Sequence, residues 1–154
     1  MPSVLDHRIP PPLVGAVIAA AMWGVAGVGP AFDWPALPKY VIVGLLAAAG
    51  SAFDLLGLIA FRASRTTVNP LKPQRASALV TGGVYRITRN PMYVGLALLL
   101  LAWAVHLAAL LPLLGPVLLV LYLTRFQIRP EERALEARFG QAYADYAARV
   151  RRWL

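Results

Sequence analysis

Residues 91–124 read PMYVGLALLLLAWAVHLAALLPLLGPVLLVLYLT and contain no formal charge. A helix that rises 1.5 Å per residue needs about 20 apolar residues to cross a bilayer core about 30 Å thick. The stretch is therefore too long for one span and too short for two full ones. We predict a tight helical hairpin over residues 91–128 that turns near His106 to Leu111. Pro112 then falls in the first turn of the second arm, where proline is tolerated.

Two further apolar runs precede the hairpin. The run from Leu13 to Phe32 has no charge, and the run from Tyr40 to Phe61 is interrupted only by Asp54. We interpret residues 1–62 as two N-terminal spans joined by a turn-rich connection. The sequence therefore predicts a single domain, an all-α integral membrane protein with about four transmembrane helices.

The composition also favours a membrane protein. Of the 154 residues, 59% are hydrophobic and 14% are charged, whereas a soluble domain has about 45–50% apolar and about 25% charged residues. The absence of cysteine excludes disulfides, thiolate metal sites and a cysteine nucleophile. The net charge of +8 is accounted for by the flanks of the spans, so we expect no nucleic-acid partner.

The basic residues indicate the orientation. With four spans, both termini and the polar loop 63–90 lie on one side, which receives fourteen of the fifteen Lys and Arg residues; Lys39 is the exception. The positive-inside rule places this side in the cytoplasm.

Residues 130–154 are predicted to form a cytoplasmic amphipathic helix. Its apolar face is marked by residues that recur every three or four positions: Leu135, Phe139, Tyr143, Tyr146, Val150 and Trp153. Such a helix lies on the membrane surface or against the bundle, and Gly140 is a point at which it can bend.

Polar residues gather at both ends of the hairpin. Because antiparallel arms return both ends to one membrane surface, we expect the segments 81–90 and 125–132 to lie close together at the cytoplasmic end of the bundle. Each also has a purely structural interpretation. Asn90 and Pro91 are favoured at a helix start, the acids Glu131 and Glu132 suit the positive end of a helix dipole, and Arg125 can extend its charge to the interface.

Asp54 lies inside an apolar run, where an acid is costly and marks a functional or a pairing residue. A structural clamp across the bundle and a ligand contact fit its position equally well. Asp54 would be central if the protein were a non-enzymatic four-helix exporter or scaffold. That alternative leaves Glu131 and Glu132 unexplained.

The ordered set of motifs resembles one family. Residues 79–86 (LVTGGVYR), residues 89–95 (RNPMYVG), the apolar hairpin and the Glu131-Glu132 pair are similar to the isoprenylcysteine carboxyl methyltransferases and their small bacterial relatives. Phospholipid N-methyltransferases share the paired glutamates. The resemblance covers roughly Thr66 to Trp153. It implies S-adenosylmethionine as methyl donor, no metal, a lipophilic or lipidated acceptor from the bilayer, and a multi-pass protein of the bacterial inner membrane with both termini cytoplasmic.

The resemblance also implies roles for individual residues. Arg125 would orient an acceptor carboxylate and, with Glu131, act in catalysis. Arginine suits the carboxylate of the donor, and glutamate suits its ammonium or ribose diol. Asn90 stands where the eukaryotic family has histidine, and asparagine does not titrate near neutrality. The expected donor-binding residues are Val84, Tyr85, Arg89, Asn90, Tyr93, Glu131 and Glu132.

The chemical class of the acceptor is left open. A carboxylate, a thiol or an amine fits the resemblance, and an enzyme that methylates the amine of a phospholipid or another amine is the alternative. Methyl transfer from a sulfonium is an in-line displacement that depends on proximity and alignment, so the sequence needs no metal ligands or protein nucleophile for it.

Overall fold

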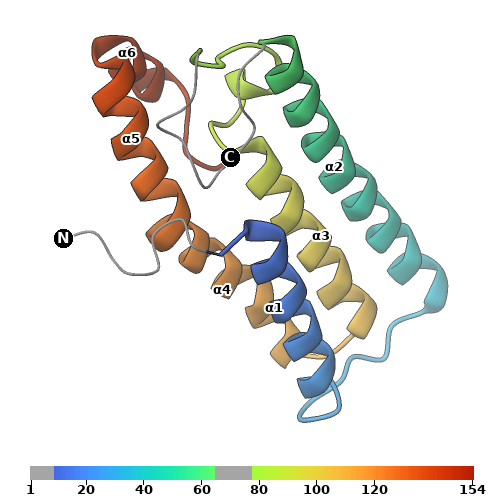
Figure 1. The fold of residues 1–154 in the computed structure, drawn as a ribbon. Helices are drawn as coiled ribbons and strands as arrows, with labels where there is room; N and C mark the ends of the chain where they lie inside the picture. Colours follow the sequence, from blue (N-terminus) through green and yellow to red (C-terminus); the bar gives the residue numbers. More distant parts are fainter. Residues whose placement is uncertain (1–8, 65–77) are drawn as a thin grey trace.

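The computed structural model describes residues 9–64 and 78–154, and this part of the chain is helical with no strand (Figure 1). The predicted all-α class is confirmed. Of the predicted loop 63–90, residues 65–77 lie outside the described residues. The helical elements, in chain order, are α1 (Pro11–Val25), α2 (Ala36–Ala63), η2 (Gly83–Arg86), α3 (Pro91–Leu107), η3 (Leu111–Leu113), α4 (Leu114–Leu123), η4 (Thr124–Ile128), α5 (Arg129–Phe139) and α6 (Gln141–Arg149).

In the described part of the chain, two helical stretches are long and apolar enough to cross a membrane, namely Ala36–Ala63 and Leu111–Phe139. The helices α1 and α3 are apolar but shorter. The run from Leu13 to Phe32 is therefore not one helix, because α1 ends at Val25. A glycine with a positive φ of 101°, Gly29, follows this end and is succeeded by a proline, and both features stop a helix.

The helix α3 is central, because it packs against α1, α2 and α4. Its contact with α2 is close, since the crossing is made by glycines on both helices. A Cβ atom added to Gly95 would lie 2.7 Å from the carbonyl oxygen of Gly50 and would also meet the carboxylate of Asp54. Asp54 therefore faces α3 at this crossing. Small residues allow such close approach of membrane helices.

The helices α3 and α4 are joined by a short turn. The helix α3 ends at Leu107, and Ala108 adopts a left-handed conformation with φ 49°. The carbonyl oxygen of Ala108 accepts a hydrogen bond from the backbone N–H of Phe32, and the N–H of Leu110 donates to Pro30. The loop after α1 therefore holds this turn.

The C-terminal region differs from the single amphipathic helix predicted over residues 130–154. The helix α5 continues from α4 through the π-helical turn η4, as Figure 1 shows. Gly140, with φ 52°, separates α5 from α6, and the backbone is extended at Val150. Residues 150–154, called here the C-terminal tail, return to the start of α3, where Thr88 and Arg151 form a parallel bridge. A left-handed glycine breaks the helix, and hydrogen bonds to the segment before α3 replace its last turn.

Candidate active site

The first of the paired glutamates is held between α3 and the π-helical turn. The Oε1 atom of Glu131 accepts hydrogen bonds of 2.7 Å from the Tyr93 hydroxyl and of 2.7 Å from Nε2 of Gln127. Gln127 is only 2% exposed and lies in η4, and π-helical turns occur often at functional sites. Gln127 was not among the predicted site residues. The signal present in the sequence is a glutamine four positions before a glutamate, which is one helical turn.

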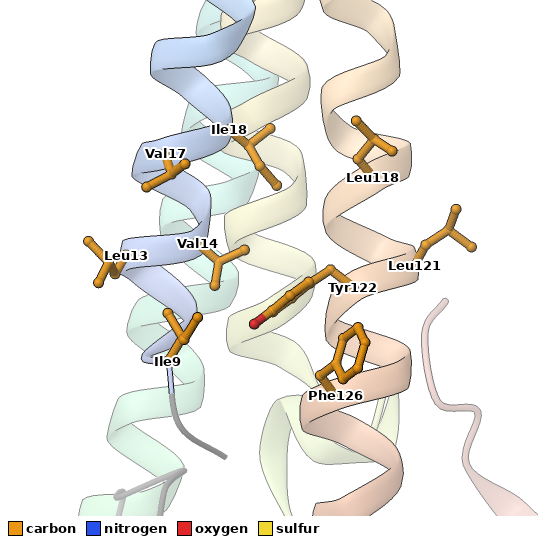
Figure 2. Close-up of a pocket in the computed structure, with 9 residues that line it drawn as sticks. All are labelled: Ile9, Leu13, Val14, Val17, Ile18, Leu118, Leu121, Tyr122 and Phe126. Atoms are coloured by element: carbon orange, nitrogen blue, oxygen red, sulfur yellow. The ribbon is translucent and has the colours of Figure 1, made fainter. Parts of the chain in front are cut away.

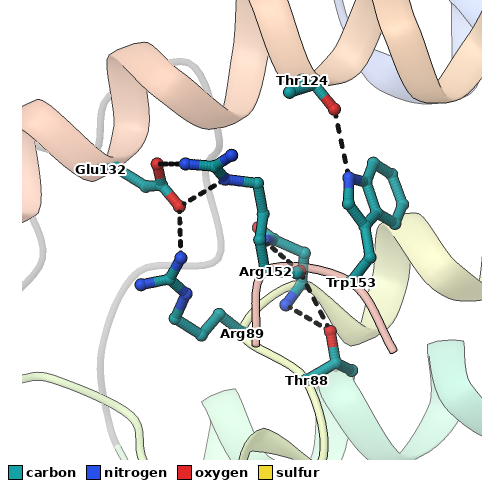
Figure 3. Close-up of polar contacts among 7 residues, drawn as sticks. Thr88, Arg89, Thr124, Glu132, Arg152 and Trp153 are labelled. Carbon is teal, nitrogen blue, oxygen red and sulfur yellow. Dashed lines mark hydrogen bonds and ion pairs between the residues drawn. The ribbon is translucent and has the colours of Figure 1, made fainter. Parts of the chain in front are cut away.

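The second glutamate is shared by two arginines (Figure 3). Nη2 of Arg89 lies 2.9 Å from Oε1 of Glu132, while Nε and Nη2 of Arg152 lie 2.9 Å from Oε1 and 2.7 Å from Oε2. The side chains are 14% exposed for Arg89, 18% for Glu132 and 35% for Arg152. Two-pronged hydrogen bonds between arginine and carboxylate are strong and fix orientation. The bond to Glu132 also raises the pKa of Arg152, which keeps it positively charged.

Arg152 was not among the predicted site residues. Arg152 lies outside the apolar face predicted for residues 130–154, and the structure places it in the C-terminal tail beside Glu132. No local pattern signals this, because the contact joins Glu132 in α5 to a tail residue twenty positions later.

The C-terminal tail is anchored at several points besides the Arg152 side chain. The carbonyl oxygen of Arg152 accepts hydrogen bonds from Oγ1 of Thr88 at 3.2 Å and Nδ2 of Asn90 at 2.8 Å. The backbone N–H of Arg89 donates to Arg151, and the Trp153 indole donates to Thr124 at 3.1 Å (Figure 3). Asn90 therefore precedes α3 as predicted, but its side chain makes no capping bond and holds the tail instead.

Tyrosines from η2 and α6 complete this region. The hydroxyl of Tyr146 donates a 2.8 Å hydrogen bond to the carbonyl oxygen of Tyr85, and both side chains are 5% exposed. Burial, with a smaller contribution from Glu132, raises the pKa of Tyr143 to about 12. Burial also raises the pKa of Tyr85 and Tyr146. All three hydroxyls are therefore protonated near neutral pH, and that of Tyr146 is already used in its bond to Tyr85.

Val84 and Tyr85 were predicted to contribute to the donor site, and their backbone carbonyl oxygens already accept hydrogen bonds within the protein. The carbonyl oxygen of Val84 accepts hydrogen bonds from the backbone of Ile87 and Thr88, and that of Tyr85 binds Tyr146. The Val84 side chain packs in a small core with Val80 and Tyr85. A role for this backbone in donor binding stays a prediction.

Arg125 lies on a different side of the same helix. It is exposed in η4, and its guanidinium lies 5.1 Å from the centre of the Phe126 ring. Phe126 lines an apolar pocket of about 650 Å³ between α1 and α4 (Figure 2). The other residues that line it are Ile9, Leu13, Val14, Val17, Ile18, Leu118, Leu121 and Tyr122. The structure therefore brings Arg89, Tyr93, Glu131 and Glu132 together and places Arg125 beside the pocket.

The cluster formed by Arg89, Tyr93, Glu131 and Glu132 has hydrogen-bonding groups that are not fully used. Nε of Arg89 is buried and has no hydrogen-bond partner among residues 9–64 and 78–154, which is rare for a buried donor. Glu131 accepts both of its hydrogen bonds, from Tyr93 and Gln127, on Oε1. Within residues 9–64 and 78–154, no group of three His, Cys, Asp or Glu is placed to hold a metal ion. The cluster thus contains a positive donor on Arg89 and a carboxylate oxygen on Glu131, which suits a ligand that carries both charges.

The family of the chain follows from comparison with known proteins. The model of the phospholipid methyltransferase family matches residues 38–142, which is more than half of the sequence. The chain belongs to the phospholipid methyltransferase family. This family is part of the isoprenylcysteine carboxyl methyltransferase-like superfamily, so the resemblance in the sequence is confirmed. The family and the two apolar helices identify a membrane protein of a methyltransferase family.

The segment matched by the family model covers only part of the site. It includes every predicted site residue from Val84 to Glu132, whereas α1 and residues 143–154, with Arg152, lie outside it. A Haemophilus influenzae protein described as uncharacterized is 46% identical over 63 residues, which make up 41% of this chain and all of that relative. No solved structure matches the chain.

Proposed function

We propose that this phospholipid methyltransferase family member transfers a methyl group from S-adenosylmethionine to a lipophilic or amphiphilic acceptor at the cytoplasmic membrane face. The observation that carries the proposal is the cluster of Arg89, Tyr93 and the paired glutamates, in which Nε of Arg89 is buried and finds no partner in the described part of the chain. In this proposal the chain crosses a bacterial inner membrane four times, with residues 91–128 as the last hairpin and both termini in the cytoplasm.

The residues of the cluster fit the charged groups of the donor. The amino-acid portion of S-adenosylmethionine carries a carboxylate and an ammonium, for which the Arg89 guanidinium and the Glu131 carboxylate are chemically suited. When bound, this donor supplies a methyl group on a sulfonium for in-line displacement. The protein has to bind the donor, hold it in line with the acceptor and keep water away.

The acceptor is proposed to lie along α4. The pocket between α1 and α4 is apolar and has about 650 Å³ of space (Figure 2), enough for the hydrocarbon portion of an amphiphile. Arg125 lies over Phe126 at the edge of this pocket. An acceptor with an anionic group would therefore meet a cation at that end, and Arg125 would orient it.

A phospholipid amine is the second candidate acceptor. The observation in its favour is the matching family model, which describes phospholipid methyltransferases. An amine needs to be neutral to accept a methyl group, so this candidate requires an environment that disfavours the ammonium form.

The test is titration of S-adenosylmethionine into the full chain in detergent, followed by calorimetry. We expect saturable binding that weakens at least about tenfold in Glu131→Gln, because a buried acceptor of two hydrogen bonds loses its charge. Glu136→Gln is the matched control, since Glu136 is exposed on the same helix. Absence of binding to folded wild-type protein, or equal affinities in both variants, would reject the proposed site.

A further inference from the structure

The C-terminal tail carries a side chain into the site from outside the segment that the family model matches. Residues 150–154 follow α6 and run beside the segment that precedes α3. We infer that Arg152 is a positioning residue for the donor site. It holds Glu132 and, through it, Arg89, while Glu131 is the glutamate that meets the donor. This inference rests on the function proposed above.

The hydrogen bonds of the two glutamates differ in a way that assigns them different roles. Both oxygens of Glu132 are occupied, since Arg152 binds Oε1 and Oε2 and Arg89 also binds Oε1. Glu131 accepts only on Oε1, so within the described residues its second oxygen accepts no hydrogen bond. A cationic ligand group can therefore bind Glu131 without breaking an existing ion pair, whereas binding Glu132 requires displacing an arginine.

The arrangement also fixes the orientation of Arg89. Its Nη2 atom donates to Glu132, and its Nε atom is buried with no partner among the residues that the structure describes. Arg152 already occupies Oε2 of Glu132. Arg89 therefore contacts Glu132 through Nη2 alone, and its Nε atom takes no part in that contact. Without Arg152, Oε2 becomes available and Arg89 can rotate to bind both oxygens. After that rotation, Nε would bind Glu132 and would not be available to an anionic group of the donor.

The position of the tail does not depend on the Arg152 side chain. Its backbone is held through Thr88, Asn90 and Arg89, and the Trp153 indole binds Thr124. Replacing the Arg152 side chain therefore removes the contact with Glu132 and leaves the tail in place. Arg151 offers a matched control, because its side chain is exposed and only its carbonyl oxygen binds Arg89.

The experiment compares S-adenosylmethionine affinities of the full chain in detergent for the wild type, Arg152→Ala, Arg152→Lys and Arg151→Ala. We expect Arg152→Ala to weaken binding at least about tenfold and Arg151→Ala to change it less than about twofold. Arg152→Lys should fall between them, because lysine restores the charge without the two-pronged geometry. Thermal unfolding of Arg152→Ala should match that of Arg151→Ala.

A double substitution tests whether Arg152 acts through Glu132. The affinity of Glu132→Gln/Arg152→Ala should equal that of Glu132→Gln, because residues that share one ion-pair network are not additive. Additive losses would overturn the inference. So would equal affinities in Arg152→Ala and Arg151→Ala, or tighter binding in Arg152→Ala, which would make Arg152 a competitor for the site. These results leave the proposed function standing, whereas failure of the wild type to bind the donor would remove both.

Discussion

The Tyr93 hydroxyl, in the first turn of α3, donates a 2.7 Å hydrogen bond to Oε1 of Glu131, in the first turn of α5. Gln127 donates to the same oxygen from one helical turn earlier. The bond from Tyr93 ties the start of α3 to the start of α5, and both bonds hold one oxygen of the carboxylate against the protein. In the proposed donor site, the other oxygen is the one that meets the ligand.

Tyr93→Phe should weaken S-adenosylmethionine binding about tenfold. The substitution removes the hydrogen bond that holds Oε1 of Glu131, so the carboxyl group is no longer oriented for the donor. A loss of about 1.4 kcal/mol of binding free energy corresponds to a tenfold change in affinity. Calorimetric titration measures the change. Tyr122→Phe makes the same chemical change at the apolar pocket and should leave donor affinity unaltered. Equal effects of the two substitutions would show that the Tyr93 hydroxyl does not organise Glu131 for binding.

Asn90→Leu should lower the unfolding temperature in detergent. The substitution removes the 2.8 Å hydrogen bond from Nδ2 to the carbonyl oxygen of Arg152, at a cost of about 0.5–1.5 kcal/mol. Asn90→His, which introduces the histidine of the eukaryotic relatives, keeps an N–H donor and should be less destabilising. If both variants melt at the wild-type temperature, Asn90 contributes nothing to anchoring the tail.

Gly95→Ala should destabilise the contact between α2 and α3. An added Cβ would lie 2.7 Å from the carbonyl oxygen of Gly50 and would meet the Asp54 carboxylate, and overpacking of this kind typically costs about 1–3 kcal/mol. Thermal unfolding in detergent measures the loss. Gly44→Ala is the control, because no atom lies within 4 Å of its added Cβ, and it should be neutral or stabilising. An unchanged Gly95→Ala protein would mean that the two helices are not closely packed there.

Leu118→Trp should reduce acceptor turnover and leave donor binding unaltered. The larger ring would fill the pocket between α1 and α4, and misplacement of an acceptor chain costs on the order of a hundredfold in rate. The assay follows labelled methyl transfer from S-adenosylmethionine to dodecanoic acid, dodecanethiol and dodecylamine. Leu45→Trp, at a residue 67% exposed on α2, controls for a bulky change on an apolar surface. Turnover equal in both variants would place the acceptor elsewhere.

Several features of the fold could be predicted from the sequence. The all-helical class follows from the long apolar runs, because backbone polar groups in a bilayer must be satisfied within each helix. The start of α3 follows from Asn90 and Pro91, since proline suits the first helical position. The end of α1 was predicted too late, at Phe32, because hydrophobicity does not distinguish a helix from the glycine-rich segment that follows Val25.

The sequence by itself determined the helical class, the family, and the residues that the family pattern selects, such as Arg89 and Glu131. These depend on local composition and on motifs that are contiguous in the chain. Only the tertiary structure decided that Gly140 breaks the predicted final helix and that Arg152 reaches Glu132. The periodicity of residues 130–154 indicates a helix that can present an apolar face, but whether the last turn forms depends on competing hydrogen bonds. Thr88, Asn90 and Arg89 supply those bonds from a distant part of the chain, and no local pattern contains them.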